Sequence, residues 1–348
     1  MFAIHIQKPS PQRNLFFAVQ LLVGLSLLII ARGIYFNYPY YQSYLNPQVM
    51  TVIGQLFWVL CGVWILDATR KYLFVEKLPV TTASLLFIYL FKVGAKLRAT
   101  ILRKKNEIDL RADKATRVAI MALVVKFFFF PIMMATVVTN GFALSTSWDM
   151  VIKGQANVNF DFIYGNTITL IFFIDTLIFA FGYVVESKWL GNQIRSVEPT
   201  MLGWVVALCT YPPFNSVTGT LLPLAKSGFA PLSPVLIYFL QLAILVCHIV
   251  FVLSSISLGT KATNLTNRGT VSRGTYRFVR HPAYTAKLTG WLLEGFLFIT
   301  TPVYFLFWLG WVGIYTLRAW TEERHLSQDP DYVAYKKKVR WLCIPGII

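Results

Sequence analysis

Long apolar runs are the feature that most limits what this chain can fold into. A helix needs roughly 20 apolar residues to cross a bilayer, and it satisfies its own backbone hydrogen bonds in lipid. The runs do not alternate between apolar and polar residues, as a membrane β-barrel would require. The sequence therefore predicts an all-α, polytopic transmembrane helical bundle of about eight spans. The predicted spans are residues 15–34, 50–67, 118–138, 163–185, 200–214, 233–258, 284–300 and 303–320.

Three shorter stretches interrupt this pattern. Residues 81–91 are too short to cross comfortably and have basic residues on both sides, so we expect one re-entrant or interfacial segment there. Paired prolines within residues 209–219 must break a helix. The sequence TTP at 300–302 separates the last two runs and predicts a tight C-terminal helical hairpin.

The charge of the chain agrees with a membrane protein. The formal net charge is +17, which in a soluble protein would suggest nucleic acid, but here the basic residues lie between apolar runs. We therefore expect anionic lipid headgroups, and no nucleic acid, as partners of the basic loops. Residues 92–117 hold nine Lys and Arg against three acids, which predicts a cytoplasmic loop. Lys8 and Arg13 place the N-terminus in the cytoplasm, and eight crossings return the C-terminus there. The sequence names neither the membrane nor an oligomeric state.

Four cysteines contain no CxxC pair, and three of them lie in or beside apolar runs. They predict small buried hydrophobes, and no metal site or disulfide framework. Ionisable residues inside the predicted spans are better candidates for function, because a charge in the bilayer is costly. Lys126 can instead extend its ammonium to the interface, and Asp175 or His248 can instead make one interhelical hydrogen bond. Glu294 is the strongest of the four, since it follows the basic stretch 272–287 by about three helical turns.

The stretch SRGTYRFVRHPAYTAK, residues 272–287, is a dense polar cluster just before an apolar run. Pro282 fits the first turn of a helix, so His281 lies at the helix entrance, where unpaired N–H groups favour an anion. Arg277 and Arg280 strengthen that positive field. The stretch predicts an anion-binding surface at the cytoplasmic side of the membrane, or simply a basic cytoplasmic loop; composition does not separate the two.

A second polar stretch, residues 315–346, continues directly from the last apolar run. Arg318, Glu322 and His325 are spaced to share one helix face, as a membrane-surface site or as a solvated helix end with an internal ion pair. Asp329 and Pro330 have the residue types of an N-cap and a first helical position. Two tyrosines then lie on one side of the new helix, where they could also be simple interfacial anchors. They are Tyr332 and Tyr335.

Three blocks occur in order in the last third of the chain. They are RGTYRFVRHPAY, then R-x-x-x-EE-x-x-L from Arg318 to Leu326, then DYVAYKKKV followed by a proline, residues 331–345. Together with the hairpin between them they resemble the integral-membrane methyltransferases, a group that includes isoprenylcysteine carboxyl methyltransferases and phospholipid N-methyltransferases. The resemblance begins near residue 255. It implies a cytosolic S-adenosylmethionine pocket under the C-terminal segment, and a lipophilic acceptor that arrives from the bilayer.

The resemblance also implies roles for single residues. One wall of the cofactor pocket would come from Tyr276, Arg280, His281, Pro282 and Tyr284. Glu322 and Glu323 would hold the methionine ammonium or the ribose, and Tyr332 and Tyr335 would pack against the cofactor. Arg318 would bind the acceptor carboxylate and take part in catalysis. An amine acceptor would need a base, for which Glu294 or His325 is the candidate.

The chain departs from the family pattern at Ala286, where a glycine is usual, and Lys287 follows it. We divide the chain into residues 1–232, of unassigned role, and 233–348, the methyltransferase-like catalytic region. Methylation of an isoprenylcysteine-type carboxylate is the favoured function, with lipid N- or O-methylation as an alternative. An NADPH-dependent reductase of the sterol-reductase type is disfavoured by RHPAY and the paired glutamates. A transporter or non-catalytic protein is disfavoured because no inverted repeat is visible.

Overall fold

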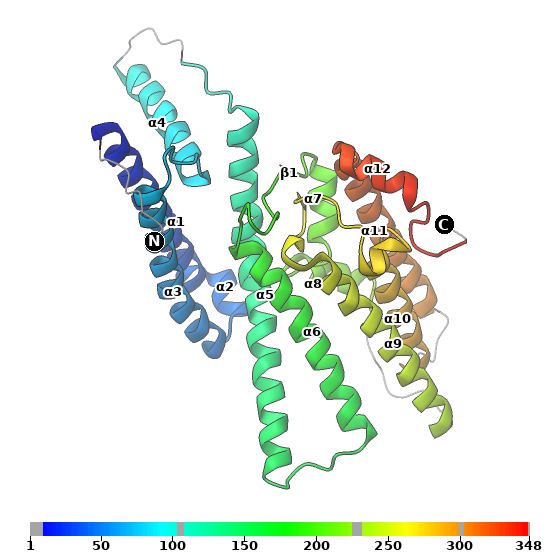
Figure 1. Cartoon of the computed structure of the whole chain (residues 1–348). Coiled ribbons are helices and arrows are strands. Elements are labelled where there is room, and N and C mark those ends of the chain that lie inside the picture. Colours follow the sequence, from blue (N-terminus) through cyan, green and yellow to red (C-terminus); the bar gives the residue numbers. More distant parts are fainter. Residues whose placement is uncertain (1–9, 103–107, 225–231, 299–302, 347–348) are drawn as a thin grey trace, which may run out of the picture. The chain divides into compact units, whose positions relative to one another are not determined.

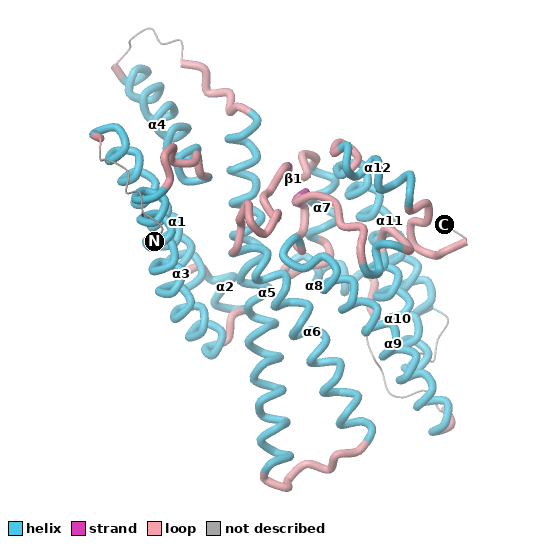
Figure 2. The backbone as a smooth tube through the Cα atoms, in the orientation of Figure 1, coloured by secondary structure: helices cyan, strands magenta, loops and turns pink. Residues whose placement is uncertain are grey.

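The computed structural model describes residues 10–102, 108–224, 232–298 and 303–346, and of these nearly all regular structure is helical (Figure 1). A backbone tube coloured by secondary structure shows the helices joined by loops (Figure 2). The chain divides into two compact units, residues Met1–Pro131 and Ile132–Ile348. The division falls within helix α5 (Lys114–Ile152), at an internal proline that cannot donate to the helical ladder. It is a division by packing and does not test the predicted functional boundary at residue 232.

The described residues of unit 1 form four helices besides the first part of α5. They are α1 (Pro11–Asn37), α2 (Pro39–Tyr44), α3 (Pro47–Phe74) and α4 (Thr82–Ile101). Helix α1 packs against α3 and α4. Gly24 permits the close approach of α3, because a Cβ at this position would lie 2.2 Å from the Trp64 ring. Arg13 of α1 donates to the carbonyls of Tyr72 and Val75, which satisfies oxygen atoms at the end of α3.

Unit 2 contains the C-terminal blocks and begins with the second part of α5. It continues through α6 (Phe160–Val184), β1 (Ser196–Val197), α7 (Met201–Leu208), α8 (Phe214–Leu221), α9 (Pro234–Leu258), η1 (Gly259–Lys261), β2 (Thr266–Asn267), η2 (Gly274–Arg277), α10 (Pro282–Phe298), α11 (Val303–Leu326) and α12 (Pro330–Lys338). Helix α9 packs against α6 and α10, and α10 packs against α11. The two short strands pair antiparallel, with Ser196 opposite Asn267.

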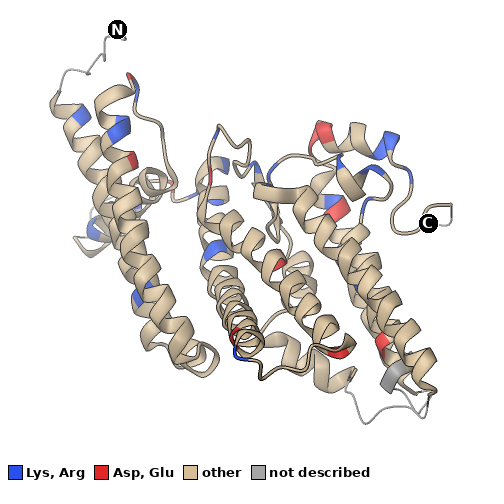
Figure 3. Cartoon of the chain, turned by 60° about the horizontal axis from the view of Figure 1, so that its bottom comes forward, with Lys and Arg blue, Asp and Glu red and all other residues tan. Residues whose placement is uncertain are grey.

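Five helices of the described residues are long and apolar enough to cross a membrane, which is consistent with a multi-pass membrane protein. They are Pro11–Asn37, Pro47–Phe74, Lys114–Ile152, Phe160–Val184 and Pro234–Lys261, the last being α9 with the turn that follows it. Each contains one predicted span, either entirely or to within one residue at one end. In unit 2, charged residues are frequent on α12 and the loops beside it, while the middle parts of the long helices hold few of them (Figure 3).

The predicted span at residues 200–214 is wrong. This stretch forms the short helix α7, a break, and the start of α8, and each of the two helices has only eight residues. Eight residues of helix extend about 12 Å, less than half of the hydrocarbon core. The reason is the proline pair that predicted a helix break within 209–219, and that break is confirmed by the turn between α7 and α8.

The last two predicted spans coincide with α10 and α11 but are not among the five. The described part of α10 has 17 residues, and α11 ends in a charged turn. The predicted TTP break lies outside the described residues. Helix α4 is longer than the predicted segment 81–91, because a capping box between Thr81 and Ser84 begins the helix and the basic residues that follow continue it to Ile101.

Candidate functional site

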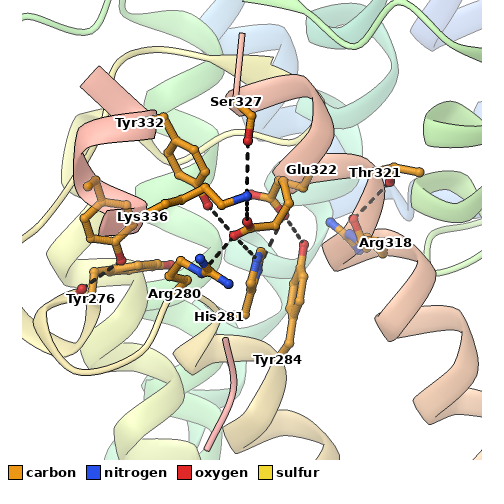
Figure 4. A network of polar contacts seen from close by, with 12 residues as sticks. Tyr276, Arg280, His281, Tyr284, Arg318, Thr321, Glu322, Ser327, Tyr332 and Lys336 are labelled. Atoms are coloured by element: carbon orange, nitrogen blue, oxygen red, sulfur yellow. Dashed lines mark hydrogen bonds and ion pairs between the residues drawn. The ribbon is translucent and has the colours of Figure 1, made fainter. Parts of the chain in front are cut away.

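A buried carboxylate joins the C-terminal blocks in unit 2. Glu323 Oε1 accepts hydrogen bonds from His281 Nε2 at 3.2 Å and from the Tyr332 hydroxyl at 2.6 Å. Lys336 Nζ lies 2.7 Å from its other oxygen, and Arg280 Nε lies 3.2 Å from Oε1. Figure 4 shows these side chains converging from the loop before α10 and from helices α11 and α12. Glu323 therefore connects all three blocks.

The charge of Glu323 is stabilised by these partners. Burial alone would raise the pKa of Glu323, but the hydrogen bonds from His281, Lys336 and Tyr332 outweigh it and lower the pKa to about 2. Burial and the bond to Glu323 raise the pKa of Tyr332, so its hydroxyl remains a donor. Both oxygens of Glu323 have protein partners, and its side chain is only 9% exposed. The structure thus gives Glu323 a structural role.

Two tyrosines of α12 pack beside Glu323, on one side of the helix as their spacing predicted. Tyr332 and Tyr335 are both buried, with ring centroids 5.5 Å apart, and they pack with Tyr276, Leu326 and Val339. The Tyr335 hydroxyl donates to the Tyr276 carbonyl at 2.7 Å. Helix α12 begins as predicted, with Asp329 as its N-cap and Pro330 at the first position.

The start of α10 is fixed by the chain that follows α12. The backbone N–H groups of Arg280 and His281 donate to the carbonyls of Trp341 and Leu342 at 3.0 and 2.8 Å. The Thr285 hydroxyl donates to the Cys343 carbonyl at 3.1 Å. Helix α10 begins at Pro282, in agreement with its predicted place in the first turn. The C-terminal segment therefore covers the N-terminal end of α10.

Glu322 differs from its neighbour in exposure and in partners. Its side chain is 44% exposed, and Oε2 accepts one hydrogen bond, of 2.8 Å, from the Tyr284 hydroxyl. The Tyr284 ring stacks on the His281 ring, with centroids 5.3 Å apart and planes at 16°. His281 Nδ1 lies 4.0 Å from Glu322 Oε2. Glu322 therefore keeps capacity to accept further hydrogen bonds from a cation.

Arg318 lies one turn before Glu322 on α11 and is 9% exposed. It donates to Thr210 Oγ1 at 2.7 Å and to Asn264 Oδ1 at 2.6 Å, both neutral acceptors. The guanidinium carbon also lies 5.4 to 5.9 Å from the centroids of three tyrosine rings, which belong to Tyr211, Tyr284 and Tyr315. Within the described ranges no carboxylate is within ion-pairing distance of Arg318. Its positive charge is therefore held by neutral groups.

Sequence reasoning missed the residues that position Arg318. Asn264 donates from its backbone N–H and from Nδ2 to the Tyr183 hydroxyl, at 2.9 and 2.8 Å, which orients its amide oxygen toward Arg318. Leu265, the next residue, has a left-handed φ of 61°, which costs a leucine about 1 kcal/mol. Neither Asn264 nor Thr210 belongs to a recognisable sequence motif. Their distances of 54 and 108 residues from Arg318 in the sequence leave no local signal.

The remaining candidates lie apart from this cluster. Glu294 is ten residues beyond Tyr284, about 15 Å along α10, and its oxygen lies 4.0 Å from His248 Nε2. Asp175 accepts a hydrogen bond from Ser255. His325 is hydrogen-bonded to Ser196 at 2.8 Å and lies 3.8 Å from Glu198. Burial lowers the pKa of His325, and this effect outweighs the negative charge of Glu198, which raises it. None of these contacts involves Arg318 or Glu322.

Of the predicted site residues, all but Glu294 come together around the meeting point of α10, α11 and α12. Among the described residues, no group of three or more His, Cys, Asp and Glu is placed to hold a metal ion. Comparisons of the chain with protein-family models, with curated proteins and with solved structures give no match.

Proposed function

We propose that the protein is an S-adenosylmethionine-dependent methyltransferase that acts on a membrane-embedded lipophilic acceptor, with an isoprenylcysteine-type carboxylate favoured. One observation carries the proposal. Tyr284 lies between Glu322, an accessible carboxylate, and Arg318, a buried cation that forms no ion pair with a carboxylate of the described residues. This arrangement places an anionic group and a cationic group on the same face of α11, one turn apart.

The exposure and hydrogen bonding of Glu322 suit contact with the cofactor, and those of Glu323 do not. S-adenosylmethionine would supply an electrophilic methyl group on a positively charged sulfur. It also carries an ammonium group, and a half-exposed carboxylate with one protein donor suits such a cation. Glu323 has four protein partners and instead fixes the frame that holds His281, Arg280 and Tyr332 in place. We therefore assign contact with the cofactor to Glu322, with Tyr276, Tyr284 and His281 beside it.

The charge and position of Arg318 suit binding of the acceptor carboxylate. An acceptor carboxylate is already nucleophilic, so it needs orientation more than deprotonation. A guanidinium matches a carboxylate in a planar, two-bond geometry. The neutral partners of Arg318 fix the side chain without cancelling its charge. Glu294 takes no part in the methylation of a carboxylate. A base at this position would matter only if the acceptor were an amine.

Binding of the cofactor is the first test. Purified protein should bind S-adenosylmethionine in a calorimeter, and Glu322→Gln should weaken that binding by roughly tenfold or more, the value of a charged hydrogen bond. Glu76→Gln, at a glutamate of unit 1, is the matched control and should bind as the wild type does. Binding of NADPH in place of S-adenosylmethionine would favour a reductase, and binding of neither would refute both enzymes.

The acceptor can then be found without guessing its identity. Membranes that contain the protein would be incubated with methyl-labelled S-adenosylmethionine and extracted with organic solvent. We expect base-labile label in the lipid-soluble fraction, as a methyl ester, and none with Arg318→Ala. Base-stable label in phospholipid would indicate N-methylation and would overturn the carboxylate assignment.

A further inference from the structure

Lys287, which follows Ala286 in the sequence, contacts the same tyrosine ring as Arg318. Lys287 is on α10 and Arg318 is on α11, and both contact the ring of Tyr315, at 5.7 and 5.9 Å from its centroid. Lys287 Nζ also lies 5.0 Å from the Trp291 ring and 5.9 Å from the Phe251 ring. Two cations from neighbouring helices therefore share one aromatic wall.

Neither cation has a carboxylate within ion-pairing distance among the described residues, and Asp175 and Glu322 attract Lys287 and Arg318, respectively, only from farther away. In the part of the chain that the structure describes, no carboxylate oxygen lies within 4.0 Å of Lys287 Nζ or of the Arg318 guanidinium. The acids of the same helices are bound elsewhere: Glu294 faces His248 and Glu322 accepts from Tyr284. Asp175 of α6 is bonded to Ser255.

Aromatic faces stabilise these cations but do not neutralise them. A cation on a ring gains about 0.5 to 2 kcal/mol, much less than the cost of removing a charge from water. Two like charges near each other also repel, and the repulsion is strongest where water is scarce. A ligand with two negative charges would remove both penalties at once, while a single carboxylate would balance only one of them.

We propose that Lys287 and Arg318 together form a subsite for a dianionic head group of a lipophilic molecule, such as a phosphomonoester or a dicarboxylate. The inference rests on the proposed methyl transfer in one respect, since the head group would be that of the acceptor, and it then favours an acceptor with a second negative charge over an isoprenylcysteine with a single carboxylate. Arg318 binds one oxygen pair through its planar guanidinium, and Lys287 binds the remaining charge as a point cation. The neighbouring Trp291 and Phe251 favour an apolar chain attached to the head group.

The test compares head groups on one chain length. The purified protein, in a neutral detergent at pH 8 and without cofactor, would be titrated with dodecyl phosphate, dodecylsuccinate and dodecanoate, each competing with radiolabelled dodecyl phosphate. We expect both dianions to bind at least tenfold more tightly than dodecanoate. Inorganic phosphate, which lacks the chain, should compete only weakly; strong competition by it would show a site for a water-soluble anion and overturn the lipophilic part of the proposal.

Variants at residue 287 test the role of the lysine. Lys287→Met keeps the length of the side chain and should bring the preference for dianions below about threefold, while Lys287→Arg should keep it. Lys337→Met, at an exposed lysine of α12, is the matched control. Equal affinity of the wild-type protein for dodecyl phosphate and dodecanoate would refute the subsite, as would an unchanged preference in Lys287→Met. Neither result would affect the binding of S-adenosylmethionine, so the subsite and the proposed function fail separately.

Discussion

The Tyr284 hydroxyl donates a 2.8 Å hydrogen bond to Glu322, and this bond links the first turn of α10 to the last turns of α11. Tyr284 comes from the RHPAY block and Glu322 from the paired glutamates, 38 residues later. The same tyrosine ring lies 5.4 Å from the Arg318 guanidinium carbon. One side chain thus contacts both the carboxylate that we assign to the cofactor and the arginine that we assign to the acceptor.

Removing the Tyr284 hydroxyl should affect the cofactor more than the fold. In Tyr284→Phe the ring stays, so the contact with Arg318 is kept, but Glu322 loses the donor that orients it. We expect the affinity for S-adenosylmethionine to fall about 3- to 10-fold, less than for Glu322→Gln, because the lost bond orients Glu322 and does not itself contact the cofactor. The measurement is calorimetric titration, with unfolding temperature as the control for folding. An affinity equal to that of the wild-type protein would show that Glu322 does not need this bond.

Glu323→Gln should destabilise the protein. The substitution keeps the shape but removes the negative charge that faces Arg280, Lys336 and His281. Breaking a buried ion pair by changing one partner costs about 3 kcal/mol or more. We expect a clear fall in the unfolding temperature, measured in detergent by intrinsic fluorescence. Asp149→Asn, at an exposed pair with Lys153, should have almost no effect, and equal shifts for both variants would contradict the structural role of Glu323.

The same carboxylate should make stability depend on pH. The pKa of Glu323 is lowered from 4.5 to about 2 in the folded protein, so its contribution is complete above about pH 4.5 and is lost as the pH falls toward 2. The difference in pKa corresponds to about 3 kcal/mol. Unfolding temperatures measured from pH 6 to pH 3 should fall more steeply for the wild-type protein than for Glu323→Gln. Parallel curves would mean that another group controls the acid sensitivity.

Asn264 should support the reaction without binding the cofactor. In Asn264→Ala, Arg318 loses an acceptor and the Tyr183 hydroxyl loses the Nδ2 donor, while the backbone N–H donor of residue 264 remains. We expect kcat/KM for the acceptor to fall about tenfold or more, while the affinity for S-adenosylmethionine stays within about twofold. Thr200→Ala, which removes the hydroxyl that caps α7, is a comparison for general damage to the fold. Equal loss of cofactor affinity in Asn264→Ala would argue that its role is only structural.

A substitution at Gly182 tests the packing of α6 against the loop that holds Asn264. A Cβ at Gly182 of α6 would lie 2.3 Å from the Ala262 carbonyl oxygen, a backbone atom that cannot move aside cheaply. Gly182→Ala should therefore cost about 1 to 3 kcal/mol by overpacking and should reduce activity as well. Gly165→Ala, in the same helix, meets nothing within 4 Å and should be neutral or slightly stabilising. Similar unfolding temperatures for the two variants would show that the loop after α9 can shift freely.

Local patterns in the sequence predicted much of this architecture. Apolar runs predicted the helices that became α1, α3, α5, α6 and α9, because backbone hydrogen bonding in lipid leaves few alternatives. Single residues predicted some helix ends, such as Asp329 and Pro330 for α12 and Pro282 for α10. The two prolines at 212 and 213 predicted a break but not the two short helices beside it, so residues 200–214 were wrongly assigned as one span. The residue types of the candidate site were also visible, since the three blocks lie close together in the sequence.

Only the tertiary structure decided which of these residues contact each other, and how those contacts set their exposure and charge pairing. Glu322 and Glu323 are adjacent and chemically identical, yet one is half-exposed with a single donor and the other is buried among four partners. In the sequence, Lys287 is only the residue that follows the departure at Ala286, and the packing of α10 on α11 alone places it with Arg318 on the ring of Tyr315. The physical reason is that burial, charge pairing and repulsion depend on distances through space, and those are set by contacts between residues tens of positions apart in the chain.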